Sequence, residues 1–270
     1  MVNGKYFVID AHCHIYPDKI AQKAEHAIEN FYHVNGFGDG TVGMLEREGE
    51  KAGIDRFIVQ SVATSPKQVT SINRFVYETV NDGNGKFIGL GTLHPESDDM
   101  ERDMNEILSL GLHGVKLHPD IQGFKIDDHR CLKIYDLCSK AGLPILMHTG
   151  DSRYDNSNPN RLVPVLEKYT DLVIIGAHLG GWSVWEEASE KLKGYPNLYV
   201  DCSSCFNWLD NDTVKRIIER YSADKVLFGT DYPMWSPSVE LNRFMSLGYS
   251  EDVNNKILSE NAIKAFNIND

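Results

Sequence analysis

The sequence predicts an α/β fold, a (β/α)8 TIM barrel, on three observations. Short apolar runs rich in β-branched residues recur along the 270 residues, separated by longer stretches of helical periodicity. Some runs, such as LVIIGA, are continuously hydrophobic, which is typical of parallel strands buried on both faces. The length of 270 residues is typical of a single TIM barrel. We therefore expect a single TIM-barrel domain over residues 1–270, with an open doubly wound sheet as the alternative architecture.

The eight expected strands share a short length and a high content of valine, isoleucine and leucine. They lie at residues 7–10, 56–62, 87–93, 114–118, 144–148, 172–178, 198–201 and 226–231. Strands that alternate with helices pair in parallel through right-handed crossovers. The carboxyl ends of all the strands should therefore meet at one rim of the barrel.

Helices are expected between the strands, and two of them carry clear start signals. The Ser-Asp-Asp sequence at 97–99 could cap a helix that runs to about Leu110. Asp127 or Asp128 is expected to start another, which ends before Gly142. The remaining expected helices lie at residues 19–30, 41–52, 159–168, 184–192, 213–221, 237–247 and 250–266.

Composition excludes several classes of function. The formal net charge of -12 argues against binding to nucleic acid or to an anionic membrane surface. No apolar run is long enough to span a bilayer, and the first residues lack the pattern of a secretory signal. The five cysteines are odd in number and sparse, unlike a disulfide framework. We expect a cytoplasmic protein with a small-molecule substrate, and a homodimer formed through outer helices as a hypothesis.

Polar side chains fall at the expected strand ends. They are His12 and His14 after the first strand, Lys116 and His118 at the fourth, His148 at the fifth, His178 at the sixth and Asp231 at the eighth. His12 and His14 stand two apart, so both imidazoles should point to one face and Cys13 to the other. Such a pair can bind one metal ion, with His148 and Asp231 completing the set and a position left for water. The alternative is that His12 and His14 are polar rim residues bonded to their neighbours.

These residues lie in stretches that together resemble a known family. The stretches are IDAHCH, GVKLHP, LPILMHTGD, IIGAHLGG, NLYVDCSS and VLFGTDYP, in the family's order. The chain resembles a member of the amidohydrolase superfamily, in the branch of predicted TIM-barrel metal-dependent hydrolases that also contains decarboxylases of aromatic-type acids. The resemblance implies that His12, His14 and His148 are metal ligands and that Asp231 touches both the metal and its water. It also implies that His178 lies beside that water as acid, base or electrophilic support.

The resemblance also implies a divalent metal ion, with zinc expected first and manganese or another ion as alternatives. Two-metal relatives carry a carboxylated lysine at the end of the fourth strand. Lys116 could be such a bridge, with His148 and His178 then holding a second ion. One metal is the more usual pattern in this branch, so we favour one ion, with Lys116 or His118 binding substrate.

The expected reaction is hydrolysis by a metal-activated water, which cleaves an amide, ester, lactone or C–N bond of a small substrate. Asp231 would accept the proton of the water and deliver it to the leaving group, while His178 stabilises the oxyanion. One alternative is a metal-dependent, non-oxidative decarboxylase that uses the same site. A second alternative is a metal-containing binding protein without turnover.

The expected substrate contacts follow the later strands. Arg153 could make a bidentate contact to a substrate carboxylate, or it could pair with a local aspartate. Trp182 and Trp208 lie in loops at the rim and suggest an apolar or ring-bearing substrate. The alternative for both indoles is packing against the ends of helices.

Overall fold

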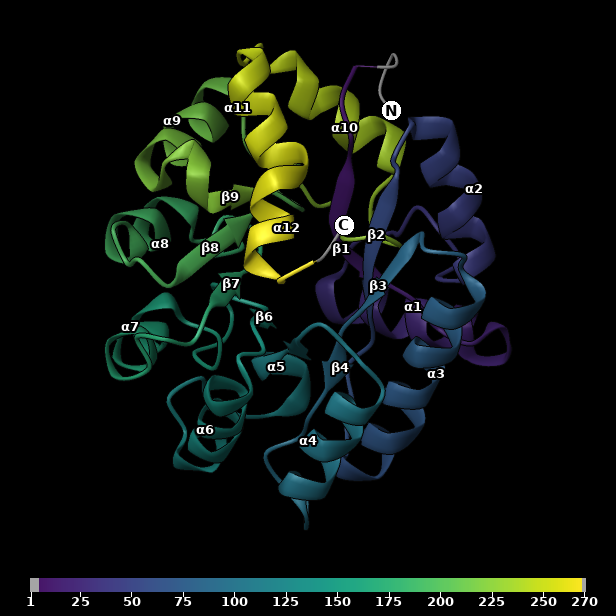
Figure 1. The fold of residues 1–270 in the computed structure, drawn as a ribbon. Coiled ribbons are helices and arrows are strands. Elements are labelled where there is room, and N and C mark those ends of the chain that lie inside the picture. The colour runs from purple at the N-terminus through teal and green to yellow at the C-terminus, as the bar shows by residue number, and fades with distance from the viewer. Residues whose placement is uncertain (1–4, 269–270) are drawn as a thin grey trace.

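A ring of short parallel strands surrounded by helices makes up the protein, seen in a computed structural model that describes residues 5–268 (Figure 1). Residues 1–4 and 269–270, the ends of the expected domain, lie outside the described residues. Neighbouring strands pair in parallel in two hydrogen-bonded sets, β1 to β3 and β4 to β9. The strands are β1 Ile9–His14, β2 Arg56–Gln60, β3 Phe87–Gly89, β4 Gly91–Thr92, β5 Val115–Leu117, β6 Ile145–Met147, β7 Ile174–Gly176, β8 Leu198–Asp201 and β9 Val226–Leu227.

Backbone hydrogen bonds join these two sets on both sides. On one side, the N–H of His113, just before β5, donates to the carbonyl of Gly89 in β3 at 2.9 Å. After β9, the N–H of Asp231 donates to the carbonyl of His12 in β1 at 2.8 Å. The chain is thus the α/β TIM barrel that the sequence predicts.

Helices follow the strands and cover the outside of the ring. They are α1 Asp18–Tyr32, α2 Val42–Ala52, α3 Val69–Asp82, α4 Met100–Ser109, α5 Pro119–Gln122, α6 Leu132–Ala141, α7 Pro159–Lys168, α8 Trp185–Leu192, α9 Asn211–Tyr221, α10 Pro237–Ser246, α11 Glu251–Asn255 and α12 Asn261–Ala265. The side chain of Asp99 caps α4, and that of Asp128 caps the turn that leads into α6, as the start signals predict. None of the helices over residues 5–268 combines the length and apolar character needed to cross a lipid bilayer.

Two expected elements are interrupted. The stretch predicted as one helix at 250–266 is α11 and α12, joined by a π-helical turn at Lys256–Glu260. The strand predicted at 87–93 is broken at Leu90 into β3 and β4. Gly89 beside the break lies against α3, where an added Cβ would come within 2.7 Å of Val76. The close approach of this helix explains why glycine, a poor strand former, stands inside the strand.

The predicted end of the first strand is wrong. It was expected at residue 10, but β1 continues to His14. A shift of register between Asp10 and Cys13 marks a β-bulge, after which β1 remains paired with β2. His12 and His14 are therefore held on a strand rather than on a loop, which fixes their directions more firmly.

Apolar side chains fill both the inside of the ring and the layer between strands and helices. The inner cluster includes Ile9, Ile58 and Leu146 from three different strands. Helix α12 lies across the end of the ring that faces the viewer in Figure 1, and its Ala262 and Ala265 belong to this cluster. The strand starts are therefore covered, and the polar side chains gather at the opposite, carboxyl end of the strands.

A buried carboxyl group on α10 should make stability depend on pH. Glu240 is fully buried, and its Oε2 has no hydrogen-bond partner among the described residues. Burial raises the pKa of Glu240 from 4.5 to about 8, so the folded chain keeps a proton that the unfolded chain releases. The stabilisation is complete below pH 4.5 and is lost as the pH rises through 8.

Replacing Glu240 with glutamine should remove this dependence. Between pH 5 and pH 8 the wild type should lose on the order of a few kcal/mol of unfolding free energy relative to the variant. Urea unfolding at both pH values measures the difference. Glu219→Gln, at an exposed position of α9, is the control and should follow the wild type. Parallel pH profiles of wild type and Glu240→Gln would contradict the prediction.

Candidate active site

Side chains from five different strand ends meet at the rim. Those within or directly after β1, β5, β6, β7 and β9 are His12, His14, Lys116, His118, His148, His178 and Asp231. His178 and Asp231 have φ angles of 59° and 61°, in the left-handed region that side-chain-bearing residues rarely adopt. Backbone strain of this kind is found at functional sites, where the surrounding structure holds it in place.

Three of these side chains converge on one point. The Nε2 atoms of His12 and His14 lie 3.2 Å apart, while Cys13 between them belongs to the outer core. Asp231 Oδ1 is 3.3 Å from His12 Nε2 and 3.6 Å from His14 Nε2. Lys116 adds a cation to this group, with its Nζ 3.0 Å from His12 Nε2.

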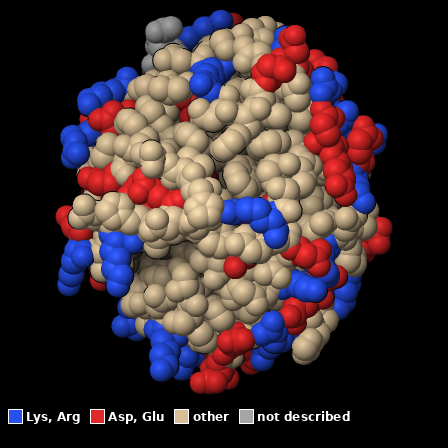
Figure 2. All heavy atoms as spheres, turned by 180° about the vertical axis from the view of Figure 1, so that it is seen from behind, with Lys and Arg blue, Asp and Glu red and all other residues tan. Residues whose placement is uncertain are grey.

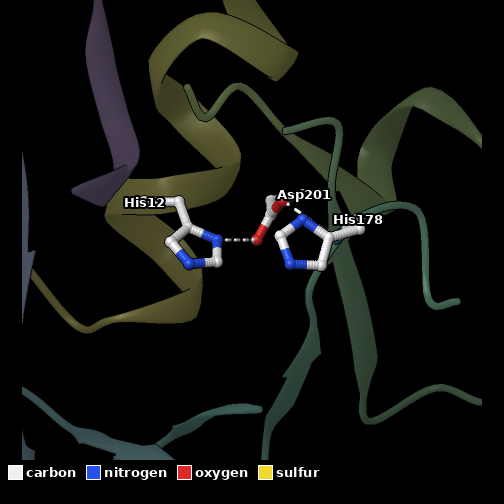
Figure 3. A group of neighbouring side chains, drawn as sticks. All are labelled: His12, His178 and Asp201. Atoms are coloured by element: carbon white, nitrogen blue, oxygen red, sulfur yellow. Dashed lines mark hydrogen bonds and ion pairs between the residues drawn. The ribbon is translucent and has the colours of Figure 1, made fainter. Parts of the chain in front are cut away.

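Asp201, at the end of β8, orients the imidazole of His12 and holds the backbone of His178. Its Oδ2 lies 2.9 Å from His12 Nδ1, and its Oδ1 accepts the backbone N–H of His178 at 3.1 Å. Figure 3 shows the carboxylate between the two rings. A proton held on Nδ1 of His12 by this carboxylate leaves Nε2 with a free lone pair aimed at His14 and Asp231. This is the usual arrangement behind a metal-bound histidine.

Replacing Asp201 with asparagine should therefore weaken metal binding. An amide can present its NH2 group to His12 and so favour the wrong tautomer of the ring. We expect the affinity for a divalent ion to fall roughly 10–100-fold. Competition with a chromophoric chelator measures the affinity, and an unchanged value would show that Asp201 does not orient His12.

Burial keeps the site histidines neutral. It lowers the pKa of each ring below the ordinary value, that of His178 to about 3; the other rings are His12, His14, His118 and His148. Burial also raises the pKa of Asp231 to about 7 and lowers that of Lys116 to about 8. Neutral imidazoles have the free nitrogen lone pair that a metal ion requires.

The donor set fits a divalent metal ion. His12 Nε2, His14 Nε2 and Asp231 Oδ1 are electron-pair donors that face one another, an arrangement that a cation would stabilise. The amide of Gln60 adds a second observation. It is fully buried, pairs in register with His14, and has no hydrogen-bond partner among the described residues. Orphaned polar atoms of this kind indicate room for a further polar group.

The fourth predicted ligand, His148, lies outside this group of three. Its Nε2 is 3.0 Å from the carbonyl oxygen of Gly150, and its Nδ1 is 3.1 Å from His178 Nε2. Its ring stacks on that of His118 at 4.0 Å, and with Asp120 these two form a second cluster of possible ligand atoms. In this orientation neither ring nitrogen of His148 faces the group formed by His12, His14 and Asp231. A second ion on Lys116, His148 and His178 stays a prediction.

A cavity of about 580 Å³ opens onto the site. Its floor includes Lys116 and His118, the two residues expected to bind substrate from the fourth predicted strand. Trp182 and Trp208 line a narrow space of about 20 Å³, which shares His148, His178 and Asp231 with the larger cavity. The two indoles therefore border the site but not the larger cavity.

Arg153 takes the second of its two expected roles, pairing with a local aspartate. Its Nε and Nη2 donate to the carboxylate of Asp151 at 3.0 and 2.7 Å, and its Nη1 donates to the carbonyl of Phe31 at 2.7 Å. It is absent from the described linings of both cavities. Its bonds fasten the loop after β6 to α1 and leave little donor capacity for a substrate carboxylate.

Two site residues were missed by the sequence analysis. Asp201 ends a predicted strand, so the rule that selected His178 and Asp231 could have found it. Tyr32 had no such signal, because it comes from the last turn of α1. Its Oη lies 2.8 Å from His118 Nε2 and 3.4 Å from His148 Nε2, and its ring lines both cavities.

Known proteins resemble this chain in sequence and in fold. A 2-amino-3-carboxymuconate-6-semialdehyde decarboxylase of Dictyostelium discoideum is 22% identical over 200 residues, which cover 60% of this chain and 55% of that protein. The match thus spans little more than half of the relative's length.

Two solved structures share the fold. An uncharacterized TIM-barrel protein of Bordetella bronchiseptica has a TM-score of 0.79 and 22% identity, over 96% of this chain and 97% of that chain. A dihydroxybenzoic acid decarboxylase of Polaromonas, with bound manganese and 2-nitroresorcinol, has a TM-score of 0.72 and 17% identity over 98% of both chains.

The sequence model of one family covers nearly the whole chain. It is the amidohydrolase family, and it matches residues 9–268. That span runs from the first residue of β1 to the end of the described residues, and so contains each strand end that contributes to the site. The chain belongs to the amidohydrolase family.

Proposed function

We propose that this protein is a metal-dependent, non-oxidative decarboxylase of a conjugated or ring-bearing carboxylic acid. The observation that carries the proposal is the cavity whose floor holds His12, His14 and Asp231 and whose walls are mainly apolar. The Dictyostelium discoideum relative and the Polaromonas structure are both decarboxylases by name. They support decarboxylation, our alternative from the sequence, over hydrolysis, which was expected first.

His12, His14 and Asp231 would hold the metal ion, with His148 as the nearest further candidate. Manganese, which the Polaromonas structure contains, becomes as good a candidate as the zinc expected first. A bound divalent cation supplies Lewis acidity, which draws electron density from an oxygen of the substrate.

The chain's own residues can supply the rest of the reaction. Loss of carbon dioxide breaks a carbon–carbon bond and leaves its electron pair on a carbon of the substrate. The carboxyl group of Asp231 can deliver a proton to that carbon and regain one from solvent. Lys116 places a buried cation beside the developing negative charge.

Products and oxygen isotopes distinguish the three possible functions. Manganese-loaded protein is incubated with a panel of hydroxybenzoates and their methyl esters in water labelled with oxygen-18, because the oxygens of these compounds do not exchange with water under mild conditions. We expect carbon dioxide and the matching decarboxylated product, with no label in that product. Label in the organic product would indicate hydrolysis, and recovery of every acid unchanged would favour a binding protein.

A further inference from the structure

We infer that the substrate carries an apolar substituent, such as an alkyl chain, that lies in the groove between α1 and α3. The inference rests on the proposed decarboxylation for the reacting end of the molecule. The substituent itself is inferred from the composition and size of the cavity.

The cavity has a polar floor and mainly apolar walls. Beyond the histidines, its walls are side chains of α1 and α3, among them Ile20, Ala24, Ala27, Ile72 and Phe75. The charged residues among the described lining are Lys23, Lys116 and Asp231. Lys116 and Asp231 belong to the floor, and Lys23 is exposed at the surface, as are the uncharged polar lining residues Thr64, Gln68 and Ser71. The groove thus offers no buried charge to bind a second polar end of a substrate.

The face of the protein opposite to that seen in Figure 1 is consistent with this character. Figure 2 shows charged side chains mainly toward the edge of that face, around a largely uncharged middle. Ile20, at the start of α1, lines the cavity and is 49% exposed. Ile20 thus continues the apolar wall of the cavity out to the protein surface.

The volume of the cavity supports a substrate larger than one small ring. Its 580 Å³ falls within the range of pockets that enclose ligands of drug size, roughly 300–1,000 Å³. A monocyclic acid held by its carboxyl group at the floor would leave the α1 and α3 walls uncovered. Each methylene group buried there should strengthen binding about fourfold.

The groove is wide beside Ala24 and Ala27 because the side chain of alanine is small. They lie three residues apart, on one face of α1, and both line the cavity. Leucine at either position would fill part of the groove, and leucine is well tolerated in helices. Gln22 is exposed on the same helix and is absent from the described lining of this cavity, so Gln22→Leu is the matched control.

Binding of unreactive analogues tests the inference without relying on turnover. The probes are 2-nitroresorcinol and a series of its 4-alkyl and 5-alkyl derivatives of increasing chain length, titrated calorimetrically into the manganese-loaded full chain. In the wild type and in Gln22→Leu, we expect the dissociation constant to fall about fourfold per added methylene over the first few. In Ala24→Leu and Ala27→Leu, this dependence on chain length should flatten.

The possible results distinguish a failure of this inference from a failure of the proposed function. Affinity that is independent of chain length in the wild type, or a dependence that both leucine variants retain, would overturn the apolar substituent. Decarboxylation of unsubstituted acids could still occur in that case. Conversely, chain-length-dependent binding without release of carbon dioxide from any tested acid would support the groove and reject the proposed reaction.

Discussion

Replacing Asp231 with asparagine is expected to lower kcat for decarboxylation roughly a hundred- to ten-thousandfold. Asparagine keeps the shape of the side chain and one oxygen, which can bind the metal at the position of Oδ1. Its NH2 group then takes the place of Oδ2 and can donate to the hydroxyl of Ser204, which donates to Asp231 at 2.7 Å in the wild type. It carries no acidic proton to transfer to carbon. The rate should therefore fall far more than the metal content.

Initial rates of carbon dioxide release and metal analysis of the same preparation check this result together. Asp224→Asn, at an exposed position in the turn before β9 and so at the opposite end of that strand from the site, is the control and should retain full activity. An Asp231→Asn enzyme with normal kcat would show that another group protonates the product. Loss of both metal and activity would instead make Asp231 chiefly a ligand.

The sequence is sufficient to predict which side chains meet at the carboxyl-terminal rim of the barrel. Strand ends in a parallel barrel share one face, so His12, Lys116, His178 and Asp231 could be placed together although they lie far apart in the chain. The spacing of His12 and His14 likewise determines that their rings meet, because side chains alternate along a strand. Both predictions depend on the fold class rather than on details of packing.

What could not be predicted depends on side-chain rotation and on helices outside the ring. The orientation of His148 is set by the carbonyl of Gly150, a contact that no residue pattern announces. Tyr32 reaches the site because α1 folds over the rim, and Arg153 is drawn away from it by Asp151. Such contacts depend on tertiary packing around the barrel and not on local sequence.

The type of reaction could not be predicted from the sequence for a similar reason. Two imidazoles, a carboxylate and a metal can activate water or stabilise a carbanion, so this donor set serves hydrolysis and decarboxylation equally well. The walls of the cavity determine which substrate reaches it, and those walls come largely from α1 and α3. Sequence motifs at the strand ends therefore predict the metal chemistry more firmly than the bond that breaks.

Replacing His14 with alanine is expected to abolish tight binding of the metal ion. His14 is partly exposed and its loss leaves no buried charge without a partner, so the variant should fold. Manganese at about a hundredfold excess over its dissociation constant should stabilise the wild type by roughly 2.7 kcal/mol, which raises Tm by roughly 5–10 °C. The His14→Ala variant should show almost no rise.

Thermal unfolding with and without manganese, followed by chelation and reloading, measures the effect. His129→Ala removes an imidazole that is 88% exposed in the turn before α6, and it should keep the full rise in Tm. Because both variants lose one histidine, a difference between them reflects the position of the ring and not the total number of imidazoles. Equal stabilisation of His14→Ala and wild type would place the metal elsewhere, with the cluster of His118, Asp120 and His148 as the next site to test.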